Sequence, residues 1–327
     1  MDWIQAFNLT AGAMFDPLTA AYILCAIGLS VHFGFTGLLN FGQAAFAAVG
    51  AYGMAIGVLT LKLPLLTAMG FSLICVIIFA LILGIPTLRL RADYLAIVTI
   101  AASEVFRYLM STVSFAKVTG GSNGLSQFGY EFFTWNPIPA GNYMIGPFNW
   151  SEGDLWLRIV AFGLVGFSTL LVWLMMRSPW GRVLKGIRED EDAVRSLGKN
   201  VFAYKLQSLI IGGIFAGLGG MVFVLAMSNV QPSAWVTNFT FMVWTVLLMG
   251  GAASMLGPIA GGMTFFALWV LTNELLAGMA AMGWLPFLDP AQIGQVRFIL
   301  IGLALMLLVI FRPQGMFGNK KELRFNG

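Results

Sequence analysis

Nine long apolar runs, separated by more polar stretches of varying length, follow one another along the chain. Each run is close to the ~20 residues that a helix needs to cross the hydrocarbon core of a bilayer. A helix also satisfies its own backbone hydrogen bonds, which lipid cannot do. The pattern therefore predicts an all-α integral membrane protein in which residues 1–327 form a single transmembrane domain. The predicted membrane helices cover residues 18–39, 41–61, 64–87, 93–113, 155–176, 206–229, 238–256, 258–278 and 293–311.

Glycines interrupt the first two of these runs. Gly34, Gly37 and Gly42 lie where residues 18–39 give way to residues 41–61. We expect a broken or re-entrant helix here. Such a break is tolerated in a membrane only where protein or water covers the exposed backbone.

The basic residues form three clusters, and all three fall on one side of a nine-helix bundle. The positive-inside rule makes that side cytoplasmic. Residues 114–154, whose only Lys or Arg is Lys117, then form an extracytoplasmic loop, and residues 177–205 form a cytoplasmic loop. The N-terminus is expected outside and the C-terminus in the cytoplasm. The clusters are Arg89 and Arg91; Arg177, Arg182, Lys185, Arg188, Arg195, Lys199 and Lys205; and Arg312, Lys320, Lys321 and Arg324.

Composition agrees with a membrane protein and excludes several other classes. The chain is 59% apolar and 10% charged, whereas a soluble domain carries roughly 25% charged residues. Aromatic residues lie within apolar runs rather than among clustered Arg and Lys, so no nucleic-acid surface is expected. Cys25 and Cys75 also lie in apolar runs and suit buried hydrophobic positions.

The sequence contains no motif for catalysis or metal binding. His32 is the single histidine, and no GxSxG, HExxH or Cys/His cluster occurs. No GxxxxGKS or GxxxxGKT loop, the usual cradle for nucleotide phosphates, is present. We therefore expect a protein that is not an enzyme and holds no metal or other cofactor. If it drives transport with ATP, another chain must supply the ATPase.

Five polar residues in the apolar runs are candidates for a translocation path: His32, Glu104, Arg107, Asn273 and Glu274. A charge at the centre of a membrane helix costs about 2.5–3.5 kcal/mol, so it needs a partner or a function. Glu104 and Arg107 are three residues apart and either neutralise each other or line the path. Glu274 either reaches the interface or serves transport. His32 suits an interhelical hydrogen bond better than a proton relay.

Small residues gather on the run at 206–229, where helix backbones are able to approach closely in lipid. We expect close helix packing there, with a hinge or a pore lining as the alternative. The residues concerned are Gly212, Gly213, Gly217, Gly219 and Gly220.

The stretch at 181–205 has the pattern of one or two amphipathic helices. Its apolar residues recur at spacings of four, seven, three and four, while charges occupy the other faces. Two i,i+4 ion pairs are expected, Arg188 with Asp192 and Glu191 with Arg195. The helix either lies on the membrane surface or docks into a partner's groove. The apolar positions are Val183, Ile187, Val194, Leu197 and Val201.

Six stretches, spread over nearly the whole chain, carry a resemblance to a known family. They are TGLLNFGQAAFAAVGAY at 36–52, LRLRADYLAIVT at 88–99, TGGSNGL at 119–125, GRVLKGIREDEDAVRSLG at 181–198, LMGGAASMLGPIAGG at 248–262 and FRPQGMFG at 311–318. Together, and in this order, they resemble the branched-chain amino-acid ABC permease family, specifically its M-type, LivM-like subunit. Within the cytoplasmic loop, Asp192, Ala193 and Val194, followed after three residues by Gly198, match the EAA-x3-G spacing of ABC importers.

The resemblance implies a multi-subunit importer in a cell membrane that works by alternating access. Its partners would be an H-type permease subunit, two ABC ATPase subunits and an extracytoplasmic solute-binding protein, all around a chain embedded in membrane lipid. The substrate would be a branched-chain amino acid or a related small polar solute such as urea or an amide. The resemblance carries the role of coupling ATP hydrolysis to the pore to Arg188, Glu189, Asp192, Ala193 and Gly198.

Three other classes compete with this interpretation. An ion-coupled secondary transporter would work without an ATPase and use Glu104 or Glu274 as its ion site. The scarcity of membrane acids and the amphipathic stretch at 181–198 disfavour it. A membrane enzyme lacks a catalytic set, and a purely structural subunit leaves residues 181–198 unexplained.

Overall fold

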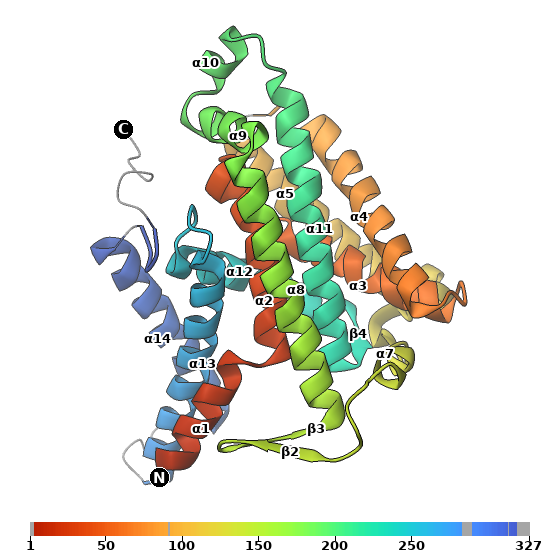
Figure 1. The fold of residues 1–327 in the computed structure, drawn as a ribbon, viewed down its shortest axis with the longest axis vertical. Helices are drawn as coiled ribbons and strands as arrows, with labels where there is room; N and C mark the ends of the chain where they lie inside the picture. Colours follow the sequence, from red (N-terminus) through yellow and green to blue (C-terminus); the bar gives the residue numbers. More distant parts are fainter. Residues whose placement is uncertain (1–2, 91, 283–289, 313, 319–327) are drawn as a thin grey trace.

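A bundle of long helices makes up the protein (Figure 1). The computed structural model describes residues 3–90, 92–282, 290–312 and 314–318. The longer helices are α1 (Trp3–Met14), α2 (Pro17–Leu29), α3 (Gln43–Leu59), α4 (Leu65–Thr87), α5 (Ala92–Ser111), α8 (Glu152–Arg177), α9 (Pro179–Glu189), α11 (Val201–Met227), α12 (Thr237–Gly250), α13 (Gly257–Ala281) and α14 (Pro290–Phe311).

Each of the nine predicted membrane runs contains a helix, but the structure does not establish nine full spans. In the described part of the chain, six helices are long and apolar enough to cross a membrane. Helices α3 and α12, with 17 and 14 residues, are apolar but shorter. Helix α1 lies in residues that the hydrophobic pattern left outside any predicted span. The all-α membrane class is therefore confirmed, and the count of nine stays a prediction.

Helix α2 is the centre of the bundle, and nearly all of its residues are buried. Asp16 caps its first turn by accepting a hydrogen bond from the Leu18 amide at 2.9 Å, and Pro17 follows at the first helical position. Helix α11 packs against both α2 and α3. These three helices form the core on which the peripheral helices rest.

Glycines on α11 allow this close packing, as predicted. A Cβ on Gly220 would lie 1.9 Å from the Ala47 carbonyl oxygen of α3, and one on Gly212 would lie 2.2 Å from Nε2 of His32, which follows α2. Separations this short leave no room for any side chain. The glycine-rich face of α11 is therefore a packing surface, as small residues are in membrane helices generally.

The predicted break after α2 is present. Helix α2 continues into a π-helical turn (Ser30–Phe35), and residues 36–42 are not helical. Gly37 has a φ of +76°, a left-handed conformation that favours glycine. The Gln43 side chain, in the first turn of α3, donates to the carbonyl oxygen of Cys25, midway along α2, at 2.8 Å. Helix α3 therefore begins inside the bundle, which explains why it is short.

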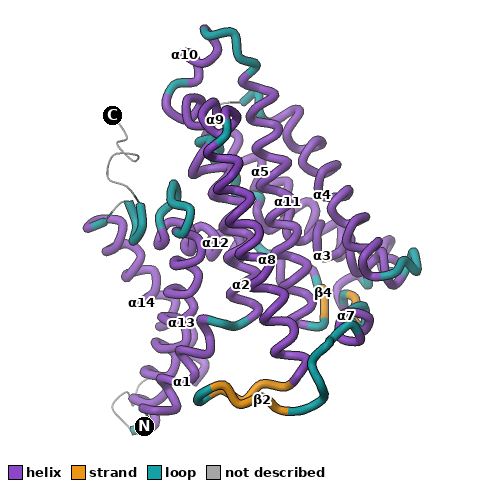
Figure 2. Tube along the Cα trace, viewed as in Figure 1, coloured by secondary structure: helices purple, strands orange, loops and turns teal. Residues whose placement is uncertain are grey.

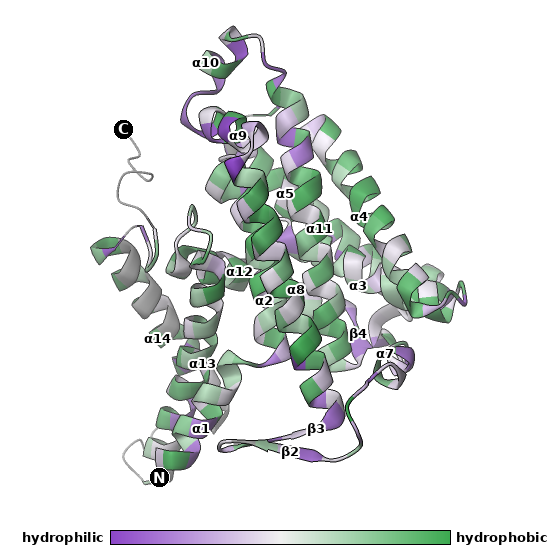
Figure 3. Ribbon diagram, in the orientation of Figure 1, coloured by the Kyte–Doolittle hydropathy of each residue, from purple (hydrophilic) through white to green (hydrophobic). Residues whose placement is uncertain are grey.

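Two ends of the bundle are clearly different (Figure 1). Helices α9 and α10 (Glu191–Ser196) project from one end, beside the turn between α4 and α5. The segment after α14 is at the level of the α12–α13 turn, because the Met316 amide donates to the Met249 carbonyl at 3.0 Å. Hydrophilic residues are concentrated on α9 and α10, whereas the long helices are largely hydrophobic (Figure 3). Of the predicted basic clusters, Arg91, Lys320, Lys321 and Arg324 lie outside the described residues.

Short elements form a compact cap at the opposite end. Strands occur there in the described part of the chain, as Figure 2 shows. Strand β1 pairs antiparallel with β4, and β2 with β3, with Leu125 opposite Val230 and Asn142 opposite Ser151. The elements are η2 (Val113–Phe115), α6 (Ala116–Thr119), η3 (Gly121–Asn123), β1 (Leu125–Ser126), α7 (Tyr130–Thr134), β2 (Asn142–Ile145), β3 (Phe148–Ser151), β4 (Asn229–Val230) and η4 (Pro232–Trp235).

Candidate coupling and translocation sites

The stretch at 178–200, here called the α9–α10 segment, folds as two capped helices. The Ser178 hydroxyl accepts from the Gly181 amide at the start of α9, and Asp190 accepts from the Ala193 amide at 2.9 Å at the start of α10. Leu184 and Ile187 are buried against the bundle. The prediction of one or two amphipathic helices is confirmed.

One of the two predicted ion pairs in this segment is wrong. Glu191 pairs with Arg195 at 2.9 Å, as the i,i+4 spacing predicts. Asp192 pairs with Arg195 at 3.1 Å rather than with Arg188. The reason is that α9 ends at Glu189, so Arg188 and Asp192 lie on different helices and the i,i+4 rule does not apply.

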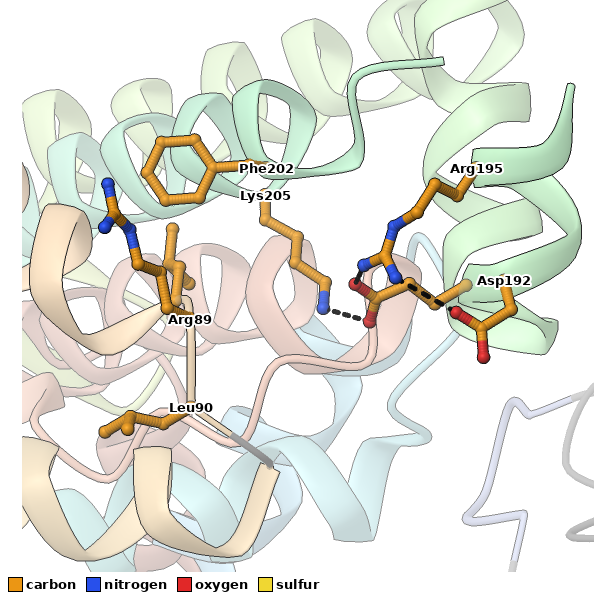
Figure 4. Close-up of a pocket in the computed structure, with 8 residues that line it drawn as sticks. Arg89, Leu90, Asp192, Arg195, Phe202 and Lys205 are labelled. Carbon is orange, nitrogen blue, oxygen red and sulfur yellow. Dashed lines mark hydrogen bonds and ion pairs between the residues drawn. The ribbon is translucent and has the colours of Figure 1, made fainter. Parts of the chain in front are cut away.

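A pocket of about 490 Å³ separates α10 from the α4–α5 turn (Figure 4). Lys205 from α11 and Arg195 from α10 both bind the carboxylate of Glu191. Arg89 reaches over the ring of Phe202, with its guanidinium carbon 5.9 Å from the ring centre. The shared carboxylate ties α10 to the first turns of α11. The segment is therefore attached to a membrane helix by charge as well as by its connecting chain.

Arg188 joins the α9–α10 segment to the break after α2. Its Nη1 donates to the carbonyl oxygen of Gly34, the next-to-last residue of the π-helical turn. Its side chain also lies against Gly37, where a Cβ would come within 3.2 Å of Arg188 Cγ. A cationic donor on a buried carbonyl is among the stronger hydrogen bonds in proteins. Movement of α9 must therefore displace the broken part of the α2–α3 connection or break this bond.

The other predicted coupling residues face away from the bundle. Glu189, Asp192, Ala193 and Gly198 are all exposed, and the Asp192 side chain retains 89% of its accessible surface. Leu197, predicted to lie on the buried apolar face, is 79% exposed. It follows the last residue of α10, so the helical spacing no longer applies there. The tip of the segment thus presents an apolar side chain among charges.

A glycine turn ends α10. The Lys199 amide donates to the Val194 carbonyl at 3.4 Å and the Gly198 amide to the Arg195 carbonyl at 3.0 Å. With Gly198 at a φ of +76°, these bonds form a Schellman motif. Gly198 therefore has a local structural role in addition to the role that family resemblance implies.

His32 is a fully buried hydrogen-bonding residue within the core. Asn40 Nδ2 donates to His32 Nδ1 at 3.1 Å, and His32 Nε2 lies 3.1 Å from the Leu209 carbonyl oxygen. Since a carbonyl only accepts, the proton resides on Nε2 and the neutral ring satisfies both neighbours. This is the interhelical role that the sequence favoured.

Polar side chains from other helices also satisfy the broken backbone. The Phe41 amide donates to Thr99 Oγ1 at 3.0 Å, and the Ala44 amide donates to Thr240 Oγ1 at 2.9 Å. Trp244 Nε1 donates to the Asn40 carbonyl at 3.2 Å. Protein therefore covers this break, as a membrane requires. The sequence analysis did not single out these residues, and the polar NFGQ interruption at 40–43 was the available signal.

Glu104 and Arg107 form the predicted ion pair on α5, with Arg107 Nε 2.8 Å from Glu104 Oε2. A third residue, Thr237 at the start of α12, donates to Glu104 Oε1 at 2.7 Å. The Glu104 and Arg107 side chains retain 28% and 18% of their accessible surface. The two charges thus neutralise each other, but the pair remains partly accessible on that face of α5.

Asn273 and Glu274 lie on α13, away from both of these sites. Arg297 of α14 donates to Asn273 Oδ1 at 3.1 Å, and its guanidinium carbon is 4.0 Å from the centre of the Trp269 ring. Among the described residues, Glu274 receives only a long 3.5 Å contact from Asn273 Nδ2. The five predicted path residues therefore occupy three separate places and do not converge on one site in this chain.

This fold and these sites define a multi-pass helical membrane protein with one polar segment presented at a single end. A model of the family described as "Branched-chain amino acid transport system / permease component" matches residues 17–310. The chain belongs to this family of transport subunits, and the predicted resemblance is confirmed.

Individual relatives agree with the family. The high-affinity branched-chain amino acid transport permease LivM of Escherichia coli is 31% identical over 91% of this chain and 68% of its own length. A probable LivM of Methanocaldococcus jannaschii is 25% identical over 91% of each chain. The BraD permease of Pseudomonas aeruginosa is 23% identical over 92% of each chain.

Proposed function

We propose that this chain is a permease subunit of an ATP-driven importer and forms half of a pore for branched-chain amino acids or a related small polar solute. The names of its LivM relatives support the substrate class. One contact supports the coupling mechanism: Arg188 of the α9–α10 segment bonds the Gly34 carbonyl at the break in the buried α2–α3 connection. A push on the exposed face of this segment is thereby transmitted to the helix core.

The end that carries the α9–α10 segment is the cytoplasmic end in this proposal. Arg89 and Lys205 line one pocket there, and the segment itself supplies further Lys and Arg residues. Residues 114–154, at the opposite end, contain Lys117 as their only Lys or Arg. Membrane proteins retain Lys and Arg on the cytoplasmic side. The C-terminus is then cytoplasmic and α1 starts on the outside.

An ABC ATPase is the proposed partner of the exposed tip. Leu197 provides an exposed apolar anchor, and the exposed Glu189 and Asp192 of the same segment provide charge. Interfaces of this kind combine an apolar centre with a polar rim. The outer cap at 114–154, with Met144 and Tyr130 both 79% exposed, is the proposed contact for a solute-binding protein.

Helix α5 is the proposed contact with the second, H-type permease subunit and a wall of the pore. It is the least buried and the least hydrophobic of the six membrane-length helices in the described part. It also carries the partly exposed Glu104–Arg107 pair. Lipid is a poor neighbour for such a pair, because ionised groups in membrane helices face protein or water. A partner subunit on the other side of a water-filled pore would supply both the protein and the water that the pair needs.

Affinity purification tests the proposal. A C-terminally tagged chain, extracted gently from native membranes, is expected to bring down a second permease and an ABC ATPase. Uptake of leucine into vesicles that contain this complex should require ATP and the solute-binding protein. A monodisperse chain that purifies alone and transports with an ion gradient would refute the proposal and favour a secondary transporter.

A further inference from the structure

A second large cavity opens at the end of the molecule opposite the α9–α10 segment. Its volume is about 850 Å³, within the range of small-molecule sites. Helix α1, the start of α2, the β2–β3 hairpin, the start of α8 and α13 surround it. This space is here called the outer cavity, and its walls include Asn8, Asp16, Trp150, Arg158, Trp269 and Glu274.

One cation in this cavity has unused hydrogen-bonding capacity. Arg158 Nη1 donates to the Asp154 carbonyl of its own helix at 3.1 Å. Its Nη2 lies 3.6 Å from Asp16 Oδ2, longer than the 2.7–2.9 Å typical of a charge-assisted hydrogen bond. Arg158 Nε is buried and has no hydrogen-bond partner among the described residues. A planar guanidinium in this condition is well suited to bind a carboxylate.

Glu274 of α13, which also lines the outer cavity, has no cationic partner among the described residues. In the described part of the chain, no ion pair involves Glu274, and its one polar contact is with Asn273 Nδ2 at 3.5 Å. The Asp16 carboxylate already has another role, because its Oδ1 accepts a hydrogen bond from the Leu18 amide and caps α2. Glu274 is therefore the carboxylate available to an ammonium group.

Aromatic residues supply the apolar part of the cavity. Trp150 of β3 lies under the Arg158 guanidinium at 4.8 Å and holds it in place. Phe266 and Trp269 of α13 line the wall that also carries Glu274. Within the described residues, Arg158 forms only a long ion pair with Asp16, and lipid tails alone would leave Glu274 without a cation in an apolar medium, which is costly.

We propose that the outer cavity binds a zwitterionic α-amino acid with an apolar side chain. Arg158 binds the carboxylate, Glu274 binds the ammonium group, and the aromatic wall accepts the side chain. This inference rests on the proposed function, in which this end faces the outside. It adds a recognition site on the permease chain itself, at the entrance that a delivered solute would meet.

Cysteine protection tests the site without ATP or a binding protein. Asn8→Cys places a thiol on the cavity wall, in the assembled complex with Cys25 and Cys75 changed to Ala. Ala140→Cys, in the exposed loop before β2 at the same end, is the control. Leucine is expected to slow maleimide labelling of the Asn8→Cys protein and not of the control. Lack of protection, or a thiol that never labels because something fills the cavity, would overturn the proposal.

Charge requirements provide the second half of the test. We expect 4-methylpentanoate, which lacks the ammonium group, and 3-methylbutylamine, which lacks the carboxylate, to protect poorly. Arg158→Gln and Glu274→Gln should each raise the protecting leucine concentration by about tenfold, equivalent to roughly 1.4 kcal/mol. Equal protection by the singly charged analogues would show that no zwitterion site exists here.

ATP-driven leucine uptake by the same complex separates this inference from the proposed function. Normal uptake without protection refutes the outer cavity as a binding site and leaves the importer assignment intact. Protection without ATP-driven uptake supports the site and refutes the importer.

Discussion

Gly198 shows how one residue combines local geometry with a proposed contact to a partner. It occupies a left-handed turn at a φ of +76°, and a Cβ there would meet no atom within 4 Å. Asn and Asp tolerate this backbone conformation better than other non-glycine residues. Substitution therefore tests conformation and charge separately.

We expect Gly198→Asn to retain transport and Gly198→Asp to uncouple it. Both side chains accept the left-handed turn, so only Asp adds a negative charge beside the exposed Leu197. Uptake by the Asp variant should fall about tenfold, equivalent to roughly 1.4 kcal/mol of interaction with the ATPase. Melting of the purified complex should be unchanged in both variants. Normal uptake by a well-expressed Gly198→Asp protein would contradict the proposed role of this turn.

The Glu104–Arg107 pair leads to a prediction about the thermal stability of the protein. Glu104→Gln alone leaves Arg107 without its carboxylate, whereas the double change to Gln and Met removes both charges. Coupled neighbours show interaction energies of about 0.5–3 kcal/mol. The single variant should therefore melt at a lower temperature than the double variant. If the effects of the two single changes simply add, the pair contributes no coupling energy.

At the scale of elements, close helix packing depends on a few glycines where two helices touch. A Cβ on Gly50 of α3 would lie 2.3 Å from the Gly217 carbonyl oxygen of α11. An added Cβ would therefore force the two backbones apart. Overpacking of this kind typically lowers the free energy of unfolding by about 1–3 kcal/mol. Some other glycines of membrane helices, such as Gly166 of α8, have open space around them.

We expect Gly50→Ala to lower the melting temperature and the yield of the complex. Gly166→Ala, on α8, is the matched control, because nothing lies within 4 Å of its added Cβ. Alanine also favours helix by up to about 1 kcal/mol relative to glycine, so this variant should be unchanged or slightly stabilised. Thermal unfolding in detergent measures both. A Gly50→Ala protein as stable as the control would show that α3 and α11 separate easily.

At the scale of the whole molecule, orientation in the membrane is the property to test. Ala140→Cys lies in the cap at one end, and Asp192→Cys lies at the exposed tip of the α9–α10 segment at the other. In intact cells, an impermeant maleimide should label Ala140→Cys at once and Asp192→Cys only after permeabilisation. The reverse pattern would invert the proposed topology, and with it the assignment of the ATPase-binding end.

The sequence by itself determined the class of the protein and much of its pattern. Apolar runs must be helical in lipid, so each predicted run contains a helix in the structure. Spacing also predicted the Glu104–Arg107 pair and the amphipathic helices at 179–196, because i,i+3 and i,i+4 neighbours depend only on helix geometry. The pairing of Arg188 with Asp192 failed for the same reason, since that rule ends where α9 ends.

Tertiary structure alone decided which distant residues meet. Arg188 bonds Gly34, and Thr237 joins Glu104, across 154 and 133 positions of sequence. No local periodicity encodes such contacts, because they depend on how whole helices pack. Helix length alone also could not show that α3 begins inside the bundle. The outer cavity arises in the same way, since Arg158 and Glu274 acquire a common space only when α8, α13 and the hairpin assemble.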